Sequence, residues 1–353
     1  MNLVRYAAWG IAVTALLSCC SWAQAPQGSA TNPAPAEIGR ALAAARTLVN
    51  AQKNDEGIQL LKPLAAQRPE PAGVEAILGK AYYQKGNYAE AASHLERALG
   101  ESPEDVESIQ LLGLSDYRLG RAAQAIPLLE KFQSSLPHPD PSGLYVLGAL
   151  FLDTRQFDRA RAAFAGMFGV PPESAQAHLV LGQMMMHQNL EDQAAPELRQ
   201  ALAQDPRLPM AHFLLGEVDL YRSRVSEALA EFQAELKVNP ISWVAYWRMG
   251  DAYSRLGQWD DAERALKQSI WLDQTFTGPY VLLGKVELKK GDALLAAGFL
   301  ERALQMDPNN FSAHYLLGTA YQELGRTADA EREFAASQKL HPEERSPHAQ
   351  REQ

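Results

Sequence analysis

Residues 314–342 read HYLLGTAYQELGRTADAEREFAASQKLHP and contain the pattern that decides the fold. An apolar-Gly pair, Leu317-Gly318, is followed twelve residues later by Ala330, and Pro342 comes twelve residues after that. The same residue types recur in the same frame along most of the chain. Self-similarity at a fixed interval of a few tens of residues is typical of a stack of helical repeats.

Three columns of residues define eight repeated units. The glycines lie 34 residues apart, with one step of 35, at Gly79, Gly113, Gly148, Gly182, Gly216, Gly250, Gly284 and Gly318. The alanine column has no exception and contains Ala91, Ala125, Ala160, Ala194, Ala228, Ala262, Ala296 and Ala330. The proline column has one exception, Gln274, and contains Pro103, Pro137, Pro172, Pro206, Pro240, Pro308 and Pro342.

The residue types of these columns predict a helix-turn-helix hairpin in each unit. Small residues in the glycine and alanine columns let two helix backbones approach closely, whereas bulky side chains would open voids in a close-packed core. A proline cannot continue a helix, so it ends the second helix of one unit before the next unit begins. Large residues such as Phe164 and Phe232 fill the remaining core sites.

The pattern resembles the tetratricopeptide repeat (TPR) family, whose 34-residue consensus is W-x2-L-G-x2-Y, then A-x3-F, then P. Leu78-Gly79 with Tyr82, Ala91, Leu95 and Pro103 match it in the first clear unit. The resemblance covers residues 72–344. It implies an all-α fold, a right-handed TPR superhelix (α-solenoid) of eight clear repeats.

Three units depart from the family pattern in their first helix. Asp116, Asp219 and Glu287 replace the tyrosine there. Tyr117 follows Asp116, and Tyr221 lies two residues after Asp219. We expect these two tyrosines to compensate in part for the missing consensus tyrosine.

The ends of the repeat array are expected to be atypical, because one face of each has no neighbour. A ninth, degenerate unit is predicted at 38–71, with Ala45 in the glycine column and Gly57 in the alanine column. The second helix of the last unit is polar and is predicted to cap the stack. Residues 345–353 are expected to form a polar tail.

The first residues resemble an export signal: one basic residue, Arg5, precedes an apolar run and a stretch of small residues. We predict a signal peptide at 1–23, with cleavage after Ala23 or after Ala25. Alternatively, Leu16-Leu17-Ser18-Cys19 resembles a bacterial lipobox, in which Cys19 would be lipidated. Residues 24–37 read as a flexible spacer rich in Pro, Ala and Ser. The predicted location is periplasmic or extracellular, or alternatively the outer membrane as a lipoprotein.

Composition and motifs argue against several classes of function. A formal net charge of -9 does not suit a general nucleic-acid binder, which needs a basic surface. No pattern of a nucleophile elbow, zinc protease, P-loop or dinucleotide site occurs. Once 38–344 is assigned to repeats, no room remains for a catalytic domain, so we expect no enzyme activity and no cofactor. His178, His212 and His314 share one column, but equivalent sites of stacked repeats lie too far apart to bind one metal ion.

A second stripe of each first helix lies opposite the hairpin core, and the TPR resemblance implies that it lines a concave groove for peptides. The residue three before each glycine, here called position 5, becomes aromatic or aliphatic from the third unit onward. An alternative is that position 5 packs between neighbouring first helices and is buried. The candidate partner-binding residues on this stripe are Tyr83, Tyr117, Arg118, Tyr145, Leu179, Gln183, Phe213, Glu217, Tyr221, Trp247, Asp251, Arg255, Lys285, Lys289 and Tyr315.

The sequence therefore predicts an exported scaffold that binds a protein or peptide. TPR domains that grip a C-terminal carboxylate carry an Asn one residue after the glycine, and no unit here has one. Two alternatives remain open. One is a lipid-anchored envelope assembly factor similar to the pilotins of type IV pili and secretins, and the other is an accessory subunit of an envelope enzyme. The identity of the partner and the oligomeric state are left open.

Overall fold

The computed structural model describes residues 34–340, and all of its regular elements are α-helices. The helices alternate between the first and the second member of a hairpin. The first helices are α1 (Pro35–Asn50), α3 (Val74–Gln84), α5 (Val106–Arg118), α7 (Pro141–Asp153), α9 (Ala175–His187), α11 (Ala211–Tyr221), α13 (Trp243–Arg255), α15 (Gly278–Lys290) and α17 (Phe311–Glu323). The second helices are α2 (Asn54–Ala65), α4 (Tyr88–Glu101), α6 (Ala122–Ser135), α8 (Phe157–Phe168), α10 (Glu191–Gln204), α12 (Val225–Val238), α14 (Trp259–Leu272), α16 (Ala293–Met306) and α18 (Thr327–Leu340).

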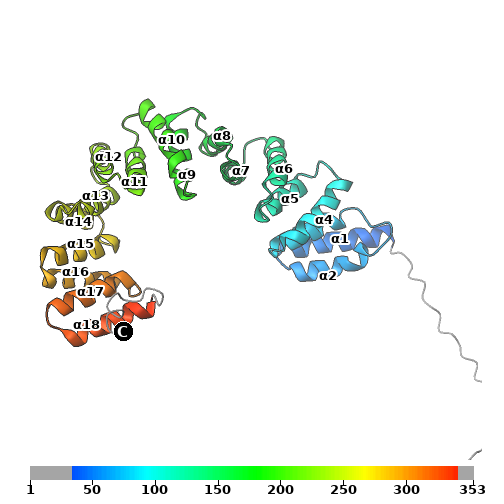
Figure 1. The fold of residues 1–353 in the computed structure, drawn as a ribbon. Coiled ribbons are helices and arrows are strands. Elements are labelled where there is room, and N and C mark those ends of the chain that lie inside the picture. The colour runs from blue at the N-terminus through cyan, green and yellow to red at the C-terminus, as the bar shows by residue number, and fades with distance from the viewer. Residues whose placement is uncertain (1–33, 341–353) are drawn as a thin grey trace, which may run out of the picture.

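The hairpins follow one another along an arc, with α7, α9 and α11 on its inner side (Figure 1). Each helix packs against its hairpin partner and against the helix that follows it in the chain. This arrangement confirms the all-α repeat stack expected from the sequence.

The glycine column marks where the two helices of each hairpin touch. A Cβ atom added to any of the eight glycines would lie less than 3.0 Å from the large side chain sixteen residues later. At Gly216, for example, it would lie 2.5 Å from the Phe232 ring, and at Gly79 it would lie 2.5 Å from Leu95. The space is therefore already filled, which explains why no side chain is tolerated at this column.

The degenerate first unit uses the same contact with altered residues. Helices α1 and α2 form a hairpin in which a Cβ on Gly57 would lie 2.7 Å from Val49 and 3.5 Å from the backbone oxygen of Ala45. Helix α1 begins at Pro35, inside the range 24–37 that the sequence suggested as spacer. A proline at the first helical position fits this start, because its missing N–H is not needed there.

The prolines mark helix ends as expected, but the sixth unit ends without one. Helix α14 stops at Leu272, although Gln274 occupies the proline column. There, Asp273 accepts hydrogen bonds from the Thr275 backbone N–H at 2.8 Å and from its hydroxyl at 2.7 Å. The same turn occurs at Asp205 and Asp307, where the proline is present, so in the sixth unit the Asp turn accompanies the helix end without the proline.

Two of the three buried acids in the tyrosine column have a cationic partner. Asp116 forms an ion pair with Arg121 at 3.3 Å, and Asp219 forms one with Arg224. The expectation that Tyr221 compensates for Asp219 is wrong, because its side chain is 66% exposed. Tyr221 lies two residues after Asp219, a rotation of about 200° around the helix, which carries its side chain away from the core.

Helix α18 closes the stack within the described part of the chain, and only Ala330 and Ser337 are buried in it. None of the helices between residues 34 and 340 is long and apolar enough to cross a membrane. The predicted signal peptide 1–23, Cys19, the end of the last repeat at 341–344 and the tail 345–353 lie outside the described residues.

Candidate functional site

The inner wall is the name used here for the stripe of the first helices that lies opposite the hairpin core. Side chains of this stripe meet across neighbouring first helices. The Lys80 ammonium on α3 donates to Asn50 Oδ1 on α1 at 2.9 Å and contacts Glu107 on α5 at 2.5 Å. Farther along, Arg248 on α13 pairs with Glu217 on α11 at 2.5 Å. Side chains of the stripe thus join neighbouring first helices from α1 to α5 and from α11 to α13.

Position 5 is never fully buried on this wall. Tyr145 and Tyr315 are 47% and 41% exposed, and the other members of the column are half-buried. Aromatic members have one edge against the second helix of their own hairpin. Ring centroids lie 6.2 Å apart for Tyr145 and Phe164 and 5.8 Å apart for Phe213 and Phe232. One side of each ring is thus fixed by the hairpin, while the other remains open to solvent.

The surroundings of Trp247 are more aromatic than the sequence suggested. The ring of Phe276, from the loop between α14 and α15, lies edge-on to Trp247 with centroids 4.9 Å apart. Trp243 lies 5.0 Å from the same ring, and the guanidinium of Arg248 lies 4.3 Å from the Trp247 centroid. Sequence reasoning missed Trp243 and Phe276. The missing proline at Gln274 was the available signal that this loop is unusual.

The predicted charged residues differ in whether they are already paired. Asp251 and Arg255 form an ion pair at 2.8 Å within α13. Burial raises the pKa of Glu217, although Arg248 opposes this shift. By contrast, Lys285 and Lys289 on α15 are exposed and form no hydrogen bond or ion pair within residues 34–340.

The remaining predicted residues are spread along the wall. Tyr83 packs against Tyr88 with centroids 5.6 Å apart, and burial raises the pKa of its phenol. Tyr117 packs on the core and lies 5.9 Å from the Arg118 guanidinium. Leu179 and Gln183 on α9 are half-buried, and Tyr221 is exposed at the end of α11.

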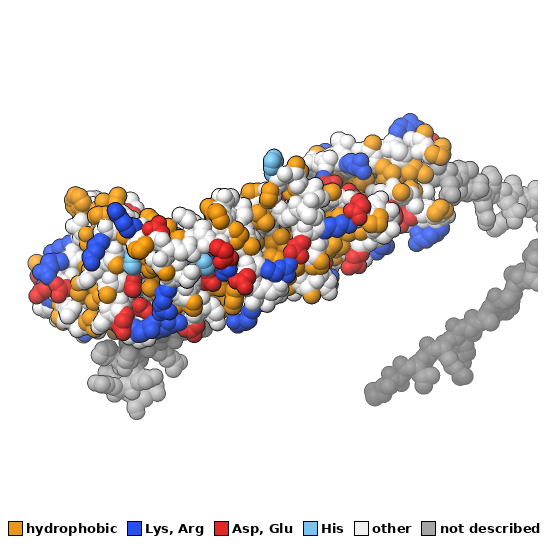
Figure 2. Space-filling model, turned by 90° about the horizontal axis from the view of Figure 1, so that it is seen from above, with side chains coloured by type: hydrophobic (Ala, Val, Ile, Leu, Met, Phe, Trp, Pro, Cys, Tyr) orange, Lys and Arg blue, Asp and Glu red, His pale blue; other side chains and the backbone are white. Residues whose placement is uncertain are grey.

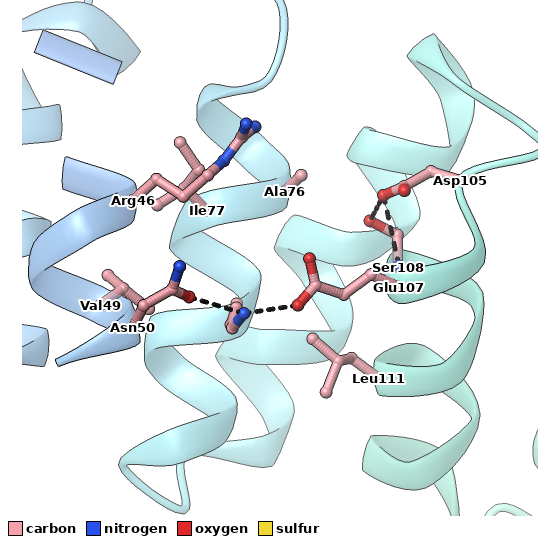
Figure 3. Close-up of a pocket in the computed structure, with 10 residues that line it drawn as sticks. Arg46, Val49, Asn50, Ala76, Ile77, Asp105, Glu107, Ser108 and Leu111 are labelled. Carbon is pink, nitrogen blue, oxygen red and sulfur yellow. Dashed lines mark hydrogen bonds and ion pairs between the residues drawn. The ribbon is translucent and has the colours of Figure 1, made fainter. Parts of the chain in front are cut away.

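A small polar cavity lies at the N-terminal end of the inner wall. It has a volume of about 120 Å³ between α1, α3 and α5, and Figure 3 shows the residues around it. Lys80 bridges Asn50 and Glu107 across it, Arg46 lines it from α1, and Ala76 leaves it open. Arg46, Asn50 and Ala76 were not among the predicted residues. Arg46 follows Ala45 in the degenerate unit, so carrying the repeat frame back would have found it.

The histidine column forms pairs inside the hairpins. His178, His212 and His314 each place Nδ1 2.6 to 2.7 Å from a glutamate nineteen residues later. The hydrogen bond with Glu231 raises the pKa of His212, against the effect of burial. No group of three or more His, Cys, Asp or Glu side chains suited to a metal ion occurs between residues 34 and 340.

Two tetratricopeptide repeat family models match the chain. One matches residues 82–144 and 287–351, and the other matches 42–106, 145–209, 188–240 and 213–270. Together they cover most of the described hairpins.

Two curated proteins are similar over short stretches. The chain is 37% identical over 110 residues to ALBINO3-like protein 3, mitochondrial, of Arabidopsis thaliana. It is 36% identical over 98 residues to the Vi polysaccharide export protein VexE of Salmonella typhi. The alignments cover 28% and 27% of this chain but only 19% and 15% of the relatives, so the chain spans less than a fifth of either relative.

Solved structures of similar fold include MamA, with 21% identity and a TM-score of 0.43 over 46% of this chain and 94% of that one. YrrB, described as a TPR protein with an unusual peptide-binding site, has 19% identity and a TM-score of 0.43 over 49% and 89% of the two chains. PilF of Pseudomonas aeruginosa has 17% identity and a TM-score of 0.48 over 57% and 92%. These likenesses concern the fold alone.

Proposed function

The chain belongs to the tetratricopeptide repeat family, and from this premise we propose that it is an exported scaffold whose inner wall binds a protein or peptide segment. The observation that carries the proposal is the position 5 column. Its aromatic and aliphatic side chains are held by the hairpins on one side and accessible on the other. Rigid aromatic side chains in such a setting are the type that dominates binding hot spots.

A binding role without catalysis fits the same geometry. The wall combines an apolar floor with scattered charges, which suits contact with another polypeptide. We therefore propose a scaffold that brings partners together and does not itself turn over a substrate.

The proposed export rests on the sequence of residues 1–23. Labelling of cells with palmitate distinguishes the two processing routes. Label that is incorporated into the wild-type chain and lost in Cys19→Ser would identify a lipoprotein and favour the envelope assembly role. A chain released without label would favour plain secretion.

The binding proposal is tested with two double variants that remove the same residue types from different faces. Phe213→Ala with Trp247→Ala should abolish cross-linking of the partner that mass spectrometry identifies with the wild-type chain. The matched control, Phe168→Ala with Trp271→Ala, removes a 58% exposed Phe and a 72% exposed Trp from the second helices α8 and α14.

The control should keep the partner, and circular dichroism should show both variants folded. Retention of the partner by the Phe213 and Trp247 variant would place the binding surface elsewhere. Loss in the control alone would place it on the second helices.

A further inference from the structure

We propose that the part of the inner wall formed by α13 and α15 recognises an acidic peptide segment that carries a large apolar side chain. This inference rests on the proposed function and specifies the chemistry of the partner. Two features of the wall lead to it: an aromatic surface at the start of α15 and two unpaired lysines in the second half of the same helix.

The aromatic surface lies in a loop that lacks two features of other repeats, the proline and a side-chain cap for the following helix. The loop before α15 has Gln274 in the proline column, and Thr277 provides no side-chain cap for the helix. In the next repeat the equivalent loop has Pro308, and Asn310 caps α17 by accepting from the Ala313 N–H at 3.0 Å.

Phe276 occupies the place that Asn310 has in that repeat. Instead of capping a helix, it packs against Trp243 and Trp247, with ring centroids 5.0 and 4.9 Å away. All three rings are only half-buried. The loop thus exchanges a helix cap for an aromatic surface that is only half-buried and therefore accessible to a partner.

The lysines supply the charge preference. Lys285 and Lys289 lie one helical turn apart on the inner face of α15, where like charges at this spacing repel each other. Three other inner-wall cations have acidic partners: Lys80 has Glu107, Arg248 has Glu217, and Arg255 has Asp251. Arg46 on α1 and Arg118 on α5 also form no ion pair within residues 34–340, but they lie on different helices, whereas Lys285 and Lys289 share α15. Glu323 of the following first helix, α17, forms no ion pair with either lysine.

The location of these lysines favours an acidic partner with a defined orientation. The chain carries a formal net charge of -9, and acidic and basic side chains are interspersed on the face seen from above the arc (Figure 2). At the other end of the inner wall, Lys80 is already neutralised by Glu107. An acidic segment therefore finds two unpaired lysines one helical turn apart on α15, whereas around the cavity beside Ala76 the unpaired cation is Arg46 alone. Electrostatic complementarity of this kind sets orientation and selects among partners.

The probes are three fluorescein-labelled synthetic peptides of equal length with alternating residues: Glu-Phe, Lys-Phe and Glu-Ser. Fluorescence anisotropy should show that the wild-type chain prefers the Glu-Phe peptide over both others. Lys285→Glu with Lys289→Glu should weaken Glu-Phe binding at least about tenfold, and salt should weaken wild-type binding. Phe276→Ser should weaken the same peptide without changing its salt dependence.

The control is Lys62→Glu with Lys237→Glu, which makes the same charge change at two exposed lysines of the second helices α2 and α12. It should leave Glu-Phe binding unchanged. Equal binding of the Lys-Phe peptide, or of the Glu-Ser peptide, would overturn the proposal. So would failure of all three peptides while partner cross-linking still depends on Phe213 and Trp247, and in that case the binding role of the wall would survive.

Discussion

Two regions of the inner wall, one near α3 and one near α13, are built on the same type of hairpin and present different surfaces. Near α3, position 5 is Ala76, and a polar cavity of about 120 Å³ opens between three first helices. Near α13, position 5 is Trp247, with the Phe276 ring 4.9 Å away and the Arg248 guanidinium over its ring at 4.3 Å. Beneath both surfaces a column glycine meets a large residue of the second helix, at Gly79 and at Gly250.

The comparison separates two sets of positions. The glycine, the alanine and the large core residue face the partner helix, so changing them opens or overfills a close-packed interior. Position 5 lies at the border between the hairpin and solvent, so it can be Ala, Tyr or Trp without disturbing the stack. The repeat pattern fixes the scaffold and leaves this column free to determine what the wall binds.

The largest effect is expected from substitutions that disrupt the helix contact common to all the hairpins. Gly216→Leu should destabilise the chain by about 3 kcal/mol, the upper range for overpacking a core. Gly79→Leu should cost less, because it meets the flexible Leu95, whereas Gly216 meets the Phe232 ring that also supports Phe213. Thermal melts followed by circular dichroism compare the two variants. An unchanged melting temperature for Gly216→Leu would mean that the helices can separate there without loss.

A smaller effect distinguishes two of the repeats by how their stability responds to pH. In the first clear repeat, burial acts to raise the pKa of Glu75, but hydrogen bonds from Arg97 and His94 outweigh this effect and lower it. In the fifth, the hydrogen bond with Glu231 raises the pKa of His212. A lowered acid pKa gives stability that is lost as pH falls through the folded value. A raised histidine pKa gives stability that is present in mild acid and lost as pH rises through the folded value.

The corresponding variants should therefore respond at opposite ends of the pH scale. Glu75→Gln should cost about 1 to 2 kcal/mol near neutral pH and little in strong acid. His212→Gln should cost up to about 1 kcal/mol near pH 6 and little at higher pH. Urea titrations at several pH values measure both. If the free energy of unfolding of the variants and of the wild type depended on pH in the same way, these ion pairs would not contribute to the pH dependence of stability.

The smallest effect compares buried acids with and without a cation. Asp116 has Arg121, whereas Glu287 is 2% exposed and its Oε1 has no hydrogen-bond partner. Glu287→Met, which introduces the residue that Met185 provides in the fourth unit, should stabilise the chain by about 1 kcal/mol. Arg121→Met should destabilise it by a similar amount, because Asp116 would then lack its partner.

The substitution of Glu287 also makes a prediction about pH. Burial and the nearby Glu263 raise the pKa of Glu287, so its folded form holds a proton more tightly than its unfolded form. Its contribution is favourable in acid and is lost as pH rises through the folded value. The gain from Glu287→Met should therefore grow with pH, as measured by chemical unfolding. A gain independent of pH would indicate a packing effect instead.

The sequence by itself determined the repeat, its frame and the helix pairs, because close helix contact requires small residues at fixed positions and the chain repeats them. It also located the stripe that contains Phe213, Trp247 and Lys285. The tertiary structure decided which of these side chains are already engaged. The cavity beside Arg46, the Phe276 ring against Trp247 and the pairing of Arg248 with Glu217 each join residues of different helices or loops. Such contacts depend on how neighbouring hairpins are placed, and a periodic pattern within one hairpin contains no information on that placement.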